Sequence, residues 1–365
     1  MQYAITTDSS HSDIMVNRLR DFTVPWAQRI VKRHCPETRV KNLELVSADI
    51  GTTTRVRLAV EHDGPQSLPR RWFVKMPSLA WRARLITALP RLLHVETRFY
   101  QDIAHSVPLN RPTLLAAQSR LGKGATLVLS DVAEHGAQPG KAGEALTLPQ
   151  AATVIEHLAR FHAAFWGIPH DQNYRWLGGP IRRLEDTLGM LMAVPLMQLG
   201  LEKAMDAVPG NLHQAALNYA RRRRQIMQLL NSGTQTLVHR DCHPGNFFWN
   251  DSKPGFLDWQ LVRMGEGIAD IAYFLATALE PELRKAHERS LLELYQQTLA
   301  AHGITVATPK ALWQRYRAHL SYPFEAMIVT LAVGGMMEET ANLEMIRRTA
   351  CAISDLDGFS ALADI

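Results

Sequence analysis

Residues 237–249 read LVHRDCHPGNFFW, and residues 255–259 read GFLDW. In the first stretch, Asn246 follows Asp241 by five positions on a short segment flanked by apolar residues. A carboxylate on such a loop can accept the proton of an attacking hydroxyl, and a nearby amide oxygen can bind a metal ion that bridges phosphate oxygens. The H-R-D-x-x-x-x-N spacing therefore predicts the catalytic loop of a phosphoryl-transfer site, with Asp241 as the base.

A second metal ligand is expected close to Asn246. Residues 247–249 have a strand-like composition, residues 250–255 have strong turn chemistry, and Phe256 resumes a strand. Such a hairpin would bring Asp258 opposite Asn246, although twelve positions separate the two residues in the sequence. We therefore expect Asn246 and Asp258 to share Mg²⁺ with a bound triphosphate.

This stretch has two other interpretations. Histidine and aspartate both bind zinc, so His239, Asp241 and His243 could form a zinc site. No further histidine or cysteine cluster follows at a useful spacing, and zinc would leave Asn246 and Asp258 unexplained. An ordinary core strand and turn would have to accommodate six polar residues in a short segment with apolar flanks.

The form V-H-x-D-x-H-P-G-N followed by F-L-D-W resembles the aminoglycoside phosphotransferase and choline kinase superfamily, and most closely its ecdysteroid-kinase-like branch. The resemblance implies an α+β, protein-kinase-like two-lobed fold, with a small antiparallel-sheet N-lobe and a mainly helical C-lobe. It also implies ATP, Mg²⁺ and a small-molecule hydroxyl acceptor. Asp270 matches a family aspartate that would brace the catalytic loop through backbone N–H groups. His239 is assigned a structural supporting role.

The periodicity of the chain fits this division. We expect an ATP-binding lobe over residues 1–133, with a hinge at its end, and a helical lobe with the catalytic loop and acceptor site over residues 134–365. The first lobe should contain strands and one helix, and the second should be mostly helical. The expected strands cover residues 43–48, 55–60, 71–76 and 126–130, and the expected helices cover residues 91–105, 148–166, 212–230, 268–279, 281–301 and 310–320.

Candidate nucleotide-binding residues in the first lobe are indicated by their order in the sequence. Lys75 lies on a predicted strand and Glu96 on the predicted helix after it, as a phosphate-binding lysine and its carboxylate partner would. A surface lysine and a solvated glutamate are the alternative. The phosphate loop departs from G-x-G-x-x-G, because only Gly51, Thr52 and Thr53 offer close backbone approach and hydroxyls. The hinge, with Leu129 and Val132, would contact adenine through backbone groups.

Composition is compatible with this interpretation. Apolar residues make up 46% of the chain, charged residues 21%, and the formal net charge is +5. The three cysteines are widely spaced, no apolar signal segment begins the chain, and the longest apolar runs, residues 190–201 and 326–337, are too short to cross a bilayer. We expect a soluble cytoplasmic protein with no nucleic-acid or membrane partner, and we interpret the arginines at 221–224 as a solvated helix face.

The acceptor is less constrained than the reaction. A protein kinase is disfavoured, because Asp258 precedes Trp259 rather than opening D-F-G, and no A-P-E follows. A nucleotide-binding pseudokinase is disfavoured because the expected catalytic groups are all present. Residues 188–201 carry no charge and residues 321–337 carry one carboxylate, Glu325. These segments are either core helices or an apolar acceptor site, so a lipophilic alcohol is the favoured acceptor, with an aminoglycoside or choline as the alternative. Oligomeric state and the choice between ATP and GTP stay open.

Overall fold

The computed structural model describes residues 13–79, 92–120, 124–168, 174, 176–177, 180–305 and 307–365. The chain divides into two compact units. The first, here called the sheet unit, comprises Met1–His105 and Pro112–Gly136. The second, the helical unit, comprises Ser106–Arg111 and Ala137–Ile365.

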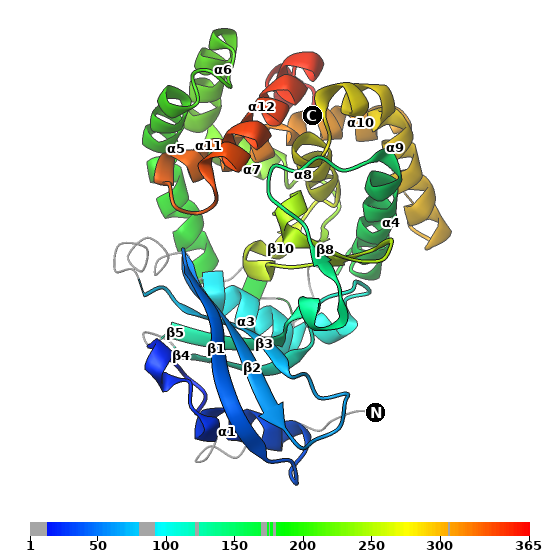
Figure 1. Cartoon of the computed structure of the whole chain (residues 1–365). Helices are drawn as coiled ribbons and strands as arrows, with labels where there is room; N and C mark the ends of the chain where they lie inside the picture. Colours follow the sequence, from blue (N-terminus) through cyan, green and yellow to red (C-terminus); the bar gives the residue numbers. More distant parts are fainter. Residues whose placement is uncertain are drawn as a thin grey trace. The chain divides into compact units, whose positions relative to one another are not determined.

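The sheet unit is built on five antiparallel strands in the order β1-β2-β3-β5-β4 (Figure 1). The strands pair so that the predicted Lys75 strand, β3, lies in the middle of the sheet. Their bounds are β1 Val40–Ile50, β2 Thr53–His62, β3 Arg71–Pro77, β4 Leu114–Arg120 and β5 Gly124–Ser130.

The two faces of this sheet differ because side chains alternate along each strand. On β2, Val56, Leu58 and Val60 are buried together with Trp72 of β3. Helix α1 (Val24–His34) belongs to this core, and the rings of Trp26 and Trp72 lie 6.0 Å apart. The opposite face carries Lys75, and α3 (Leu92–Asp102) packs against β3, β4 and β5.

The helical unit is organised around α8 (Ile268–Ala278), all of whose residues are buried. Its high apolar content explains this, since a helix that is hydrophobic on every side must be packed on every side. The surrounding helices are α4 Leu148–Ala164, α5 Pro180–Lys203, α6 Gly210–Arg221, α7 Arg223–Leu229, α9 Pro281–Ala301, α10 Pro309–His319, α11 Ser321–Val333 and α12 Glu339–Leu356.

Short strands and 3₁₀ turns complete the two units. Strands β6 (Gln138–Pro139), β8 (Phe247–Asn250) and β9 (Lys253–Phe256) form one small sheet, while β7 (Thr236–Val238) pairs with β10 (Arg263–Gly265). The 3₁₀ turns are η1 Leu19–Asp21, η2 Ala104–Ser106, η3 Val132–His135, η5 Pro244–Asn246, η6 Trp259–Leu261 and η7 Ser360–Ala363. Among the helices within the described ranges, none is long and apolar enough to cross a membrane.

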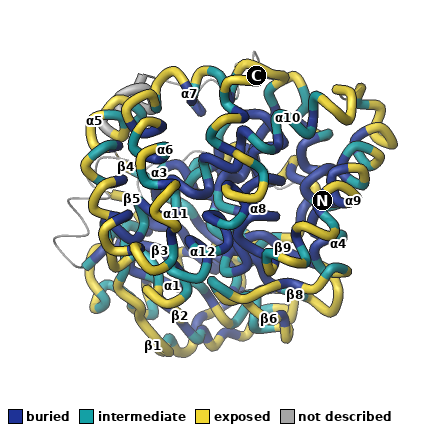
Figure 2. The backbone as a smooth tube through the Cα atoms, turned by 90° about the horizontal axis from the view of Figure 1, so that it is seen from above, coloured by how far each residue is buried: buried dark blue, intermediate teal, exposed yellow. Residues whose placement is uncertain are grey.

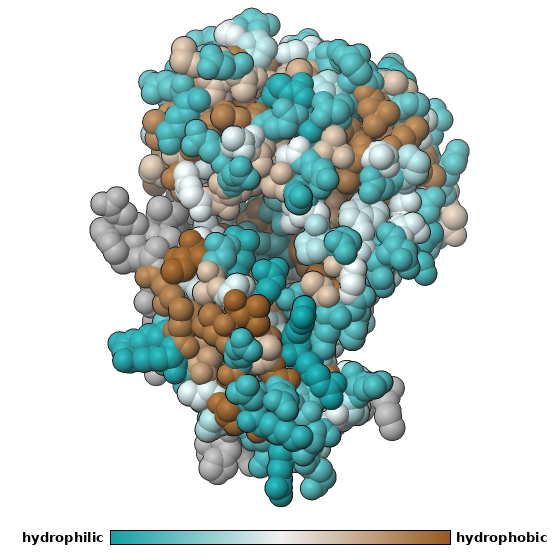
Figure 3. Space-filling view, viewed as in Figure 1, coloured by the Kyte–Doolittle hydropathy of each residue, from teal (hydrophilic) through white to brown (hydrophobic). Residues whose placement is uncertain are grey.

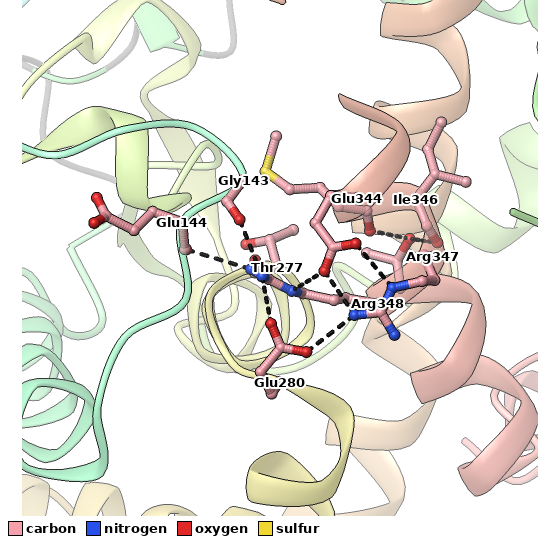
Figure 4. Close-up of polar contacts among 10 residues, drawn as sticks. Gly143, Glu144, Thr277, Glu280, Glu344, Ile346, Arg347 and Arg348 are labelled. Carbon is pink, nitrogen blue, oxygen red and sulfur yellow. Dashed lines mark hydrogen bonds and ion pairs between the residues drawn. The ribbon is translucent and has the colours of Figure 1, made fainter. Parts of the chain in front are cut away.

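A buried arginine joins three segments of the helical unit (Figure 4). Arg348 of α12 donates from Nη1 to the carbonyl oxygens of Thr277 at 3.1 Å and Glu144 at 3.3 Å. Its Nη2 donates to the carbonyl of Gly143 at 3.0 Å and to the carboxylate of Glu280 at 2.7 Å. Because α8 ends at Ala278, these bonds fasten the C-terminal turn of α8 to α12 and to the loop before α4.

The small antiparallel sheet and the many helices confirm the expected fold class. Two details of the prediction were wrong. The single helix expected over 212–230 is divided at Arg222, whose N–H is shared between the carbonyls of Asn218 and Tyr219 in a tightened turn. The loop expected over residues 49–54 is shorter, because β1 continues to Ile50 and β2 begins at Thr53.

Candidate active site

In the sheet unit, Lys75 and Glu96 form a buried ion pair. Nζ of Lys75 lies 2.8 Å from each carboxylate oxygen of Glu96. Both side chains are almost entirely shielded from solvent, and a buried charge requires such a partner. Lys75 reaches Glu96 because the two stand on β3 and α3, which pack together. The surface interpretation of these two residues is therefore wrong.

The expected phosphate loop is a tight two-residue connection between β1 and β2. The N–H of Gly51 donates to the carbonyl of Thr53 at 3.1 Å, and the hydroxyl of Ser78 donates to the carbonyl of Gly51 at 2.7 Å. Thr52 is half-buried, while Thr53 is buried as the first residue of β2. The turn is thus tied to the end of β3, the strand that carries Lys75.

The expected adenine-binding segment follows β5 directly. Leu129 is buried and pairs with Phe73 of β3. Val132 is half-buried and begins η3, whose N-cap, Asp131, accepts a hydrogen bond from the N–H of Ala133. Both residues therefore lie at the end of the sheet where the chain leaves β5.

In the helical unit, Asp270 anchors the loop that carries Asp241. Its Oδ2 accepts a hydrogen bond from the N–H of His239 at 2.7 Å, and its Oδ1 accepts one from the N–H of Arg240 at 2.8 Å. Nε2 of His162 lies 3.2 Å from Oδ2. Burial alone would raise the pKa of Asp270, but the hydrogen bond and charge of His162, aided by His239, hold this pKa below its ordinary value.

The loop itself has a strained backbone at the residue before the expected base. Arg240 has φ of 74°, in the left-handed region, which is uncommon for any residue other than glycine. Its guanidinium carbon lies 3.6 Å from the ring centroid of Tyr322. Strain of this kind persists only where the surroundings fix it, and here Asp270 and Tyr322 do so.

Two groups hold the carboxylate of Asp241 from opposite sides. The hydroxyl of Tyr273 donates to Oδ1 at 2.7 Å, and Nδ2 of Asn246 donates to Oδ2 at 2.9 Å. Nε2 of His243 lies 3.8 Å from Oδ1. Burial, together with the charge of Asp241, raises the pKa of Tyr273 well above its ordinary value, so this phenol stays protonated and remains a donor.

Asn246 is oriented by the same contacts. Its Nδ2 also donates to the carbonyl of Asp241 at 2.9 Å, so both amide hydrogens are used and the amide oxygen is left to act as an acceptor or ligand. The N–H of Leu257 donates to the carbonyl of Asn246 at 2.8 Å. The next residue, Asp258, has φ of 59°. The hairpin thus returns the chain to Asn246 immediately before Asp258, as the sequence suggested.

The donor set near this point suits Mg²⁺ better than zinc. An amide oxygen and a carboxylate are hard oxygen ligands, which Mg²⁺ prefers. The ring of His239 is engaged on both sides, since Nε2 lies 2.8 Å from the carbonyl oxygen of Leu257 and Nδ1 accepts from the N–H of Asp241 at 3.3 Å. Within the described ranges, no cluster of three or more His, Cys, Asp or Glu residues is arranged to hold a metal ion.

Tyr273 and His162 are the residues that the sequence analysis missed. Tyr273 lies three positions after Asp270 on α8, and residues at that spacing share one side of a helix. Asp270 therefore holds the backbone of the loop while Tyr273 holds its carboxylate. His162 comes from α4, far away in the sequence, and no local pattern pointed to it.

The two segments expected to form the acceptor site pack against each other as α5 and α11. Much of α11 is buried, including Phe324, Met327 and Ile328, as the core-helix alternative required. Helix α5 instead exposes Leu191 and Met192, while the placement of the Leu188 side chain lies outside the described part of the structure. Farther along the same unit, α6, α7 and η7 line a partly open pocket of about 470 Å³, which none of the predicted site residues lines.

Glu325, the one carboxylate of α11, already has two partners. Its Oε2 accepts a hydrogen bond from the hydroxyl of Tyr219 at 2.7 Å, and its Oε1 pairs with Nε of Arg223. Burial and the charge of Glu325 raise the pKa of Tyr219 well above its ordinary value, so this phenol too stays a donor. Glu325 is therefore committed to contacts within the protein.

The chain is similar to several solved structures at low sequence identity. A putative aminoglycoside phosphotransferase from Ralstonia eutropha is 13% identical, with a TM-score of 0.50, over 93% of this chain and 97% of that one. The GDP complex of wild-type aminoglycoside 2'-phosphotransferase-IIIa is 11% identical (TM-score 0.49; 89% and 97% of the two chains). A choline kinase from Cryptosporidium parvum is 10% identical (TM-score 0.48; 89% and 92%).

The comparison with curated protein sequences gives no match. Residues 89–306, more than half of the chain, match the sequence model of the ecdysteroid kinase-like family. This match includes Glu96, the loop around Asp241 and the whole of α8. The protein therefore belongs to the ecdysteroid kinase-like family.

Proposed function

We propose that the protein transfers the γ-phosphoryl group of ATP to a hydroxyl group of a small, largely apolar molecule. The observation that carries this proposal is the Asp241 carboxylate, held by Tyr273 and Asn246 on a loop that Asp270 anchors. A carboxylate in a fixed orientation can accept the proton of an alcohol as its oxygen attacks phosphorus.

The other predicted residues would bind the nucleotide and its metal ion. Lys75, oriented by Glu96, would hold the α- and β-phosphates, and the turn of Gly51, Thr52 and Thr53 would offer backbone N–H groups and hydroxyls. Backbone groups near Leu129 and Val132 would bind adenine. Because main-chain groups would contact the base, ATP is the proposed nucleotide and GTP is the alternative.

The oxygen of Asn246 and the carboxylate of Asp258 would hold Mg²⁺. Bound there, the ion would neutralise charge on the phosphate oxygens. Asn246 has a second role, because its amide hydrogens fix both the carboxylate and the carbonyl of Asp241. The same side chain thus orients the base and would place a ligand oxygen toward the metal.

An apolar acceptor is favoured by the lack of available carboxylates in the two proposed acceptor-side segments, residues 188–201 and 321–337. Recognition of a polycationic aminoglycoside needs several convergent anionic groups. In the described part of α5 between Gly189 and Leu201 there is no charged residue, and Glu325 of α11 is committed to Tyr219 and Arg223. The exposed Leu191 and Met192 add adaptable apolar surface.

The experiment is an acceptor panel with Mg·ATP, read by mass spectrometry of the phosphorylated product. It should compare steroid, terpenoid and macrolide alcohols with kanamycin-like aminoglycosides and choline. We expect transfer to one or more of the apolar alcohols and none with Asp241→Asn. Transfer to an aminoglycoside or choline alone would overturn the acceptor class, and ATP binding without transfer to any class would favour a pseudokinase.

A further inference from the structure

One face of the five-stranded sheet carries a row of charges across three strands. Asp49 of β1 is paired with Arg55 of β2, and Arg55 is paired with Lys75 of β3. Directly opposed residues of antiparallel strands point to the same face. The row therefore reads, from β1 to α3, Asp49, Arg55, Lys75 and Glu96, and strands β1 to β3 can be followed side by side in Figure 1.

The centre of this row places two cations next to each other. Side chains directly opposite in an antiparallel pair have Cβ atoms about 4.5–5.5 Å apart, and like charges there are destabilising. Lys75 is compensated by its tight buried pair with Glu96. The positive charge of Arg55 is neutralised much less. Its Nε lies 3.8 Å from Oδ2 of Asp49, and the two side chains are 36% and 70% exposed.

Arg57, the next arginine on the same face, has close partners for its guanidinium. Nε of Arg57 donates to Oδ2 of Asp131 at 3.0 Å, and its guanidinium lies 5.4 Å from the ring centroid of Phe73. Within the described ranges, Asp49 is the one ionic partner of Arg55, at a distance too long for a hydrogen bond. Arg55 thus keeps its donors available beside Lys75.

The surface around this position is partly open. The side chains of Arg55 and Asp49 are 36% and 70% exposed, and β1 is coloured as exposed along much of its length in Figure 2. In Figure 3 the visible surface of the sheet unit has brown, apolar side chains next to hydrophilic ones. Gly51, which has no side chain and so lets a ligand approach the backbone, lies four positions before Arg55. A ligand bound at this turn would therefore contact both the turn and the Arg55 side chain.

We infer that Arg55 is a second phosphate-binding cation, which together with Lys75 cradles the polyphosphate of the nucleotide. This inference rests on the proposed function. A guanidinium can bind phosphate oxygens through two parallel charge-assisted hydrogen bonds, whereas lysine acts as a point charge. A polyphosphate between Arg55 and Lys75 would also relieve their mutual repulsion. The site then recognises the phosphate chain rather than the nucleoside.

Calorimetric titration of the full chain tests this assignment with three probes: Mg·ATP, inorganic tripolyphosphate and adenosine. Arg55→Gln should weaken binding of Mg·ATP and tripolyphosphate by about tenfold or more, since it removes charge-assisted hydrogen bonds to the phosphate oxygens. Adenosine affinity should not change. Arg55→Lys should retain part of the affinity and lose the rest with the bidentate geometry.

Arg71→Gln is the matched control. Arg71 is an exposed arginine of β3 on the same face as Lys75 and four positions away from it, about 13 Å along the strand. This variant removes the same charge and should bind all three probes normally. Thermal unfolding of each variant shows whether the sheet is intact.

The possible outcomes separate this inference from the proposed function. Unchanged tripolyphosphate and ATP affinity in Arg55→Gln overturns the assignment of Arg55, even when the wild-type chain is an active kinase. An equal loss for adenosine shows that Arg55 acts on the nucleoside and also overturns it. Wild-type binding of tripolyphosphate that Arg55→Gln weakens, without binding of ATP, supports the anion site and contradicts the proposed function. A wild-type chain that binds neither ligand contradicts both.

Discussion

The hydroxyl of Tyr273 donates a 2.7 Å hydrogen bond to Oδ1 of Asp241. It comes from α8, the fully buried helix that also supplies Asp270 to the backbone of the same loop. A helix packed on every side has little freedom to move, so it fixes the loop backbone and the carboxylate together. We regard Tyr273 as a positioning residue for the proposed base.

Tyr273→Phe removes only the hydroxyl of that contact. Since a hydrogen bond to a charged group contributes roughly 1.5–3 kcal/mol, we expect kcat to fall about 10- to 100-fold. The KM for ATP should stay the same. Steady-state kinetics measure both values.

The control for Tyr273→Phe is Tyr316→Phe, which also deletes a buried tyrosine hydroxyl, one that bonds to Glu288 at 3.0 Å. It should lower stability to a similar degree while leaving kcat intact. If both variants lose kcat in proportion to their loss of stability, Tyr273 has only a structural role.

Asp258 should matter for metal-dependent nucleotide binding. Asp258 is one of the two proposed Mg²⁺ ligands, and Asp258→Asn removes its negative charge. Mg²⁺ should therefore no longer tighten ATP binding. Asparagine is chosen because it tolerates the left-handed backbone at this position better than alanine does. Calorimetry with ATP, with and without Mg²⁺, gives the comparison.

Asp251→Asn supplies the matched control, because Asp251 is an exposed aspartate of the same hairpin and also has a positive φ, 54°. Its Mg·ATP affinity should equal that of the wild type. Normal Mg²⁺-dependent tightening in Asp258→Asn would exclude Asp258 as a ligand.

Asp270 should make the fold sensitive to acid. Its pKa in the folded chain lies below the ordinary value of 3.8, so its contribution to stability is fully present above that value. The contribution is lost as the pH falls below 3.8 and through the folded-state pKa, because protonation then breaks the bonds to the catalytic loop. Urea unfolding at several pH values should show a smaller acid-dependent loss in Asp270→Asn, which starts from a lower stability. An identical pH dependence in both proteins would contradict the linkage.

Arg348 should be required for stability rather than for binding. Its side chain is 3% exposed and holds three backbone carbonyls, so Arg348→Ala leaves buried acceptors unsatisfied and should cost about 3 kcal/mol or more. Arg347, the preceding residue, is also labelled in Figure 4 and is 42% exposed. Arg347→Ala should lower the free energy of unfolding by less than about 1 kcal/mol. Denaturant unfolding measures the two losses; equal losses would contradict the role of Arg348.

The local chemistry of the catalytic hairpin was predictable from its sequence. The turn residues before Gly255 and the apolar strands on either side require the chain to return, and the structure places Leu257 against Asn246, one position before the Asp258 that was expected there. Lys75 and Glu96 could be paired because Lys75 is the only lysine between Lys41 and Lys123, and Glu96 is the only glutamate between Glu61 and Glu134. In both cases the residue types alone restrict the possible arrangements.

Contacts between distant segments could not be predicted in the same way. The side of α8 that Tyr273 shares with Asp270 was visible in the spacing, but its direction toward Asp241 depends on how α8 packs. The position of Arg55 opposite Lys75 depends on the strand register, and a shift of one residue would turn it to the other face. Helix α1 and strand β4 also escaped prediction, since their stability comes from the sheet core they join.

The most direct test of the account is single-turnover phosphoryl transfer by Asp241→Asn, measured together with its Mg·ATP affinity. The amide cannot accept the proton of the acceptor hydroxyl, and general base catalysis typically contributes about 10²–10⁴-fold. We expect a loss of that size in the transfer rate, while Mg·ATP still binds. Near-normal transfer by Asp241→Asn would show that Asp241 is not the catalytic base.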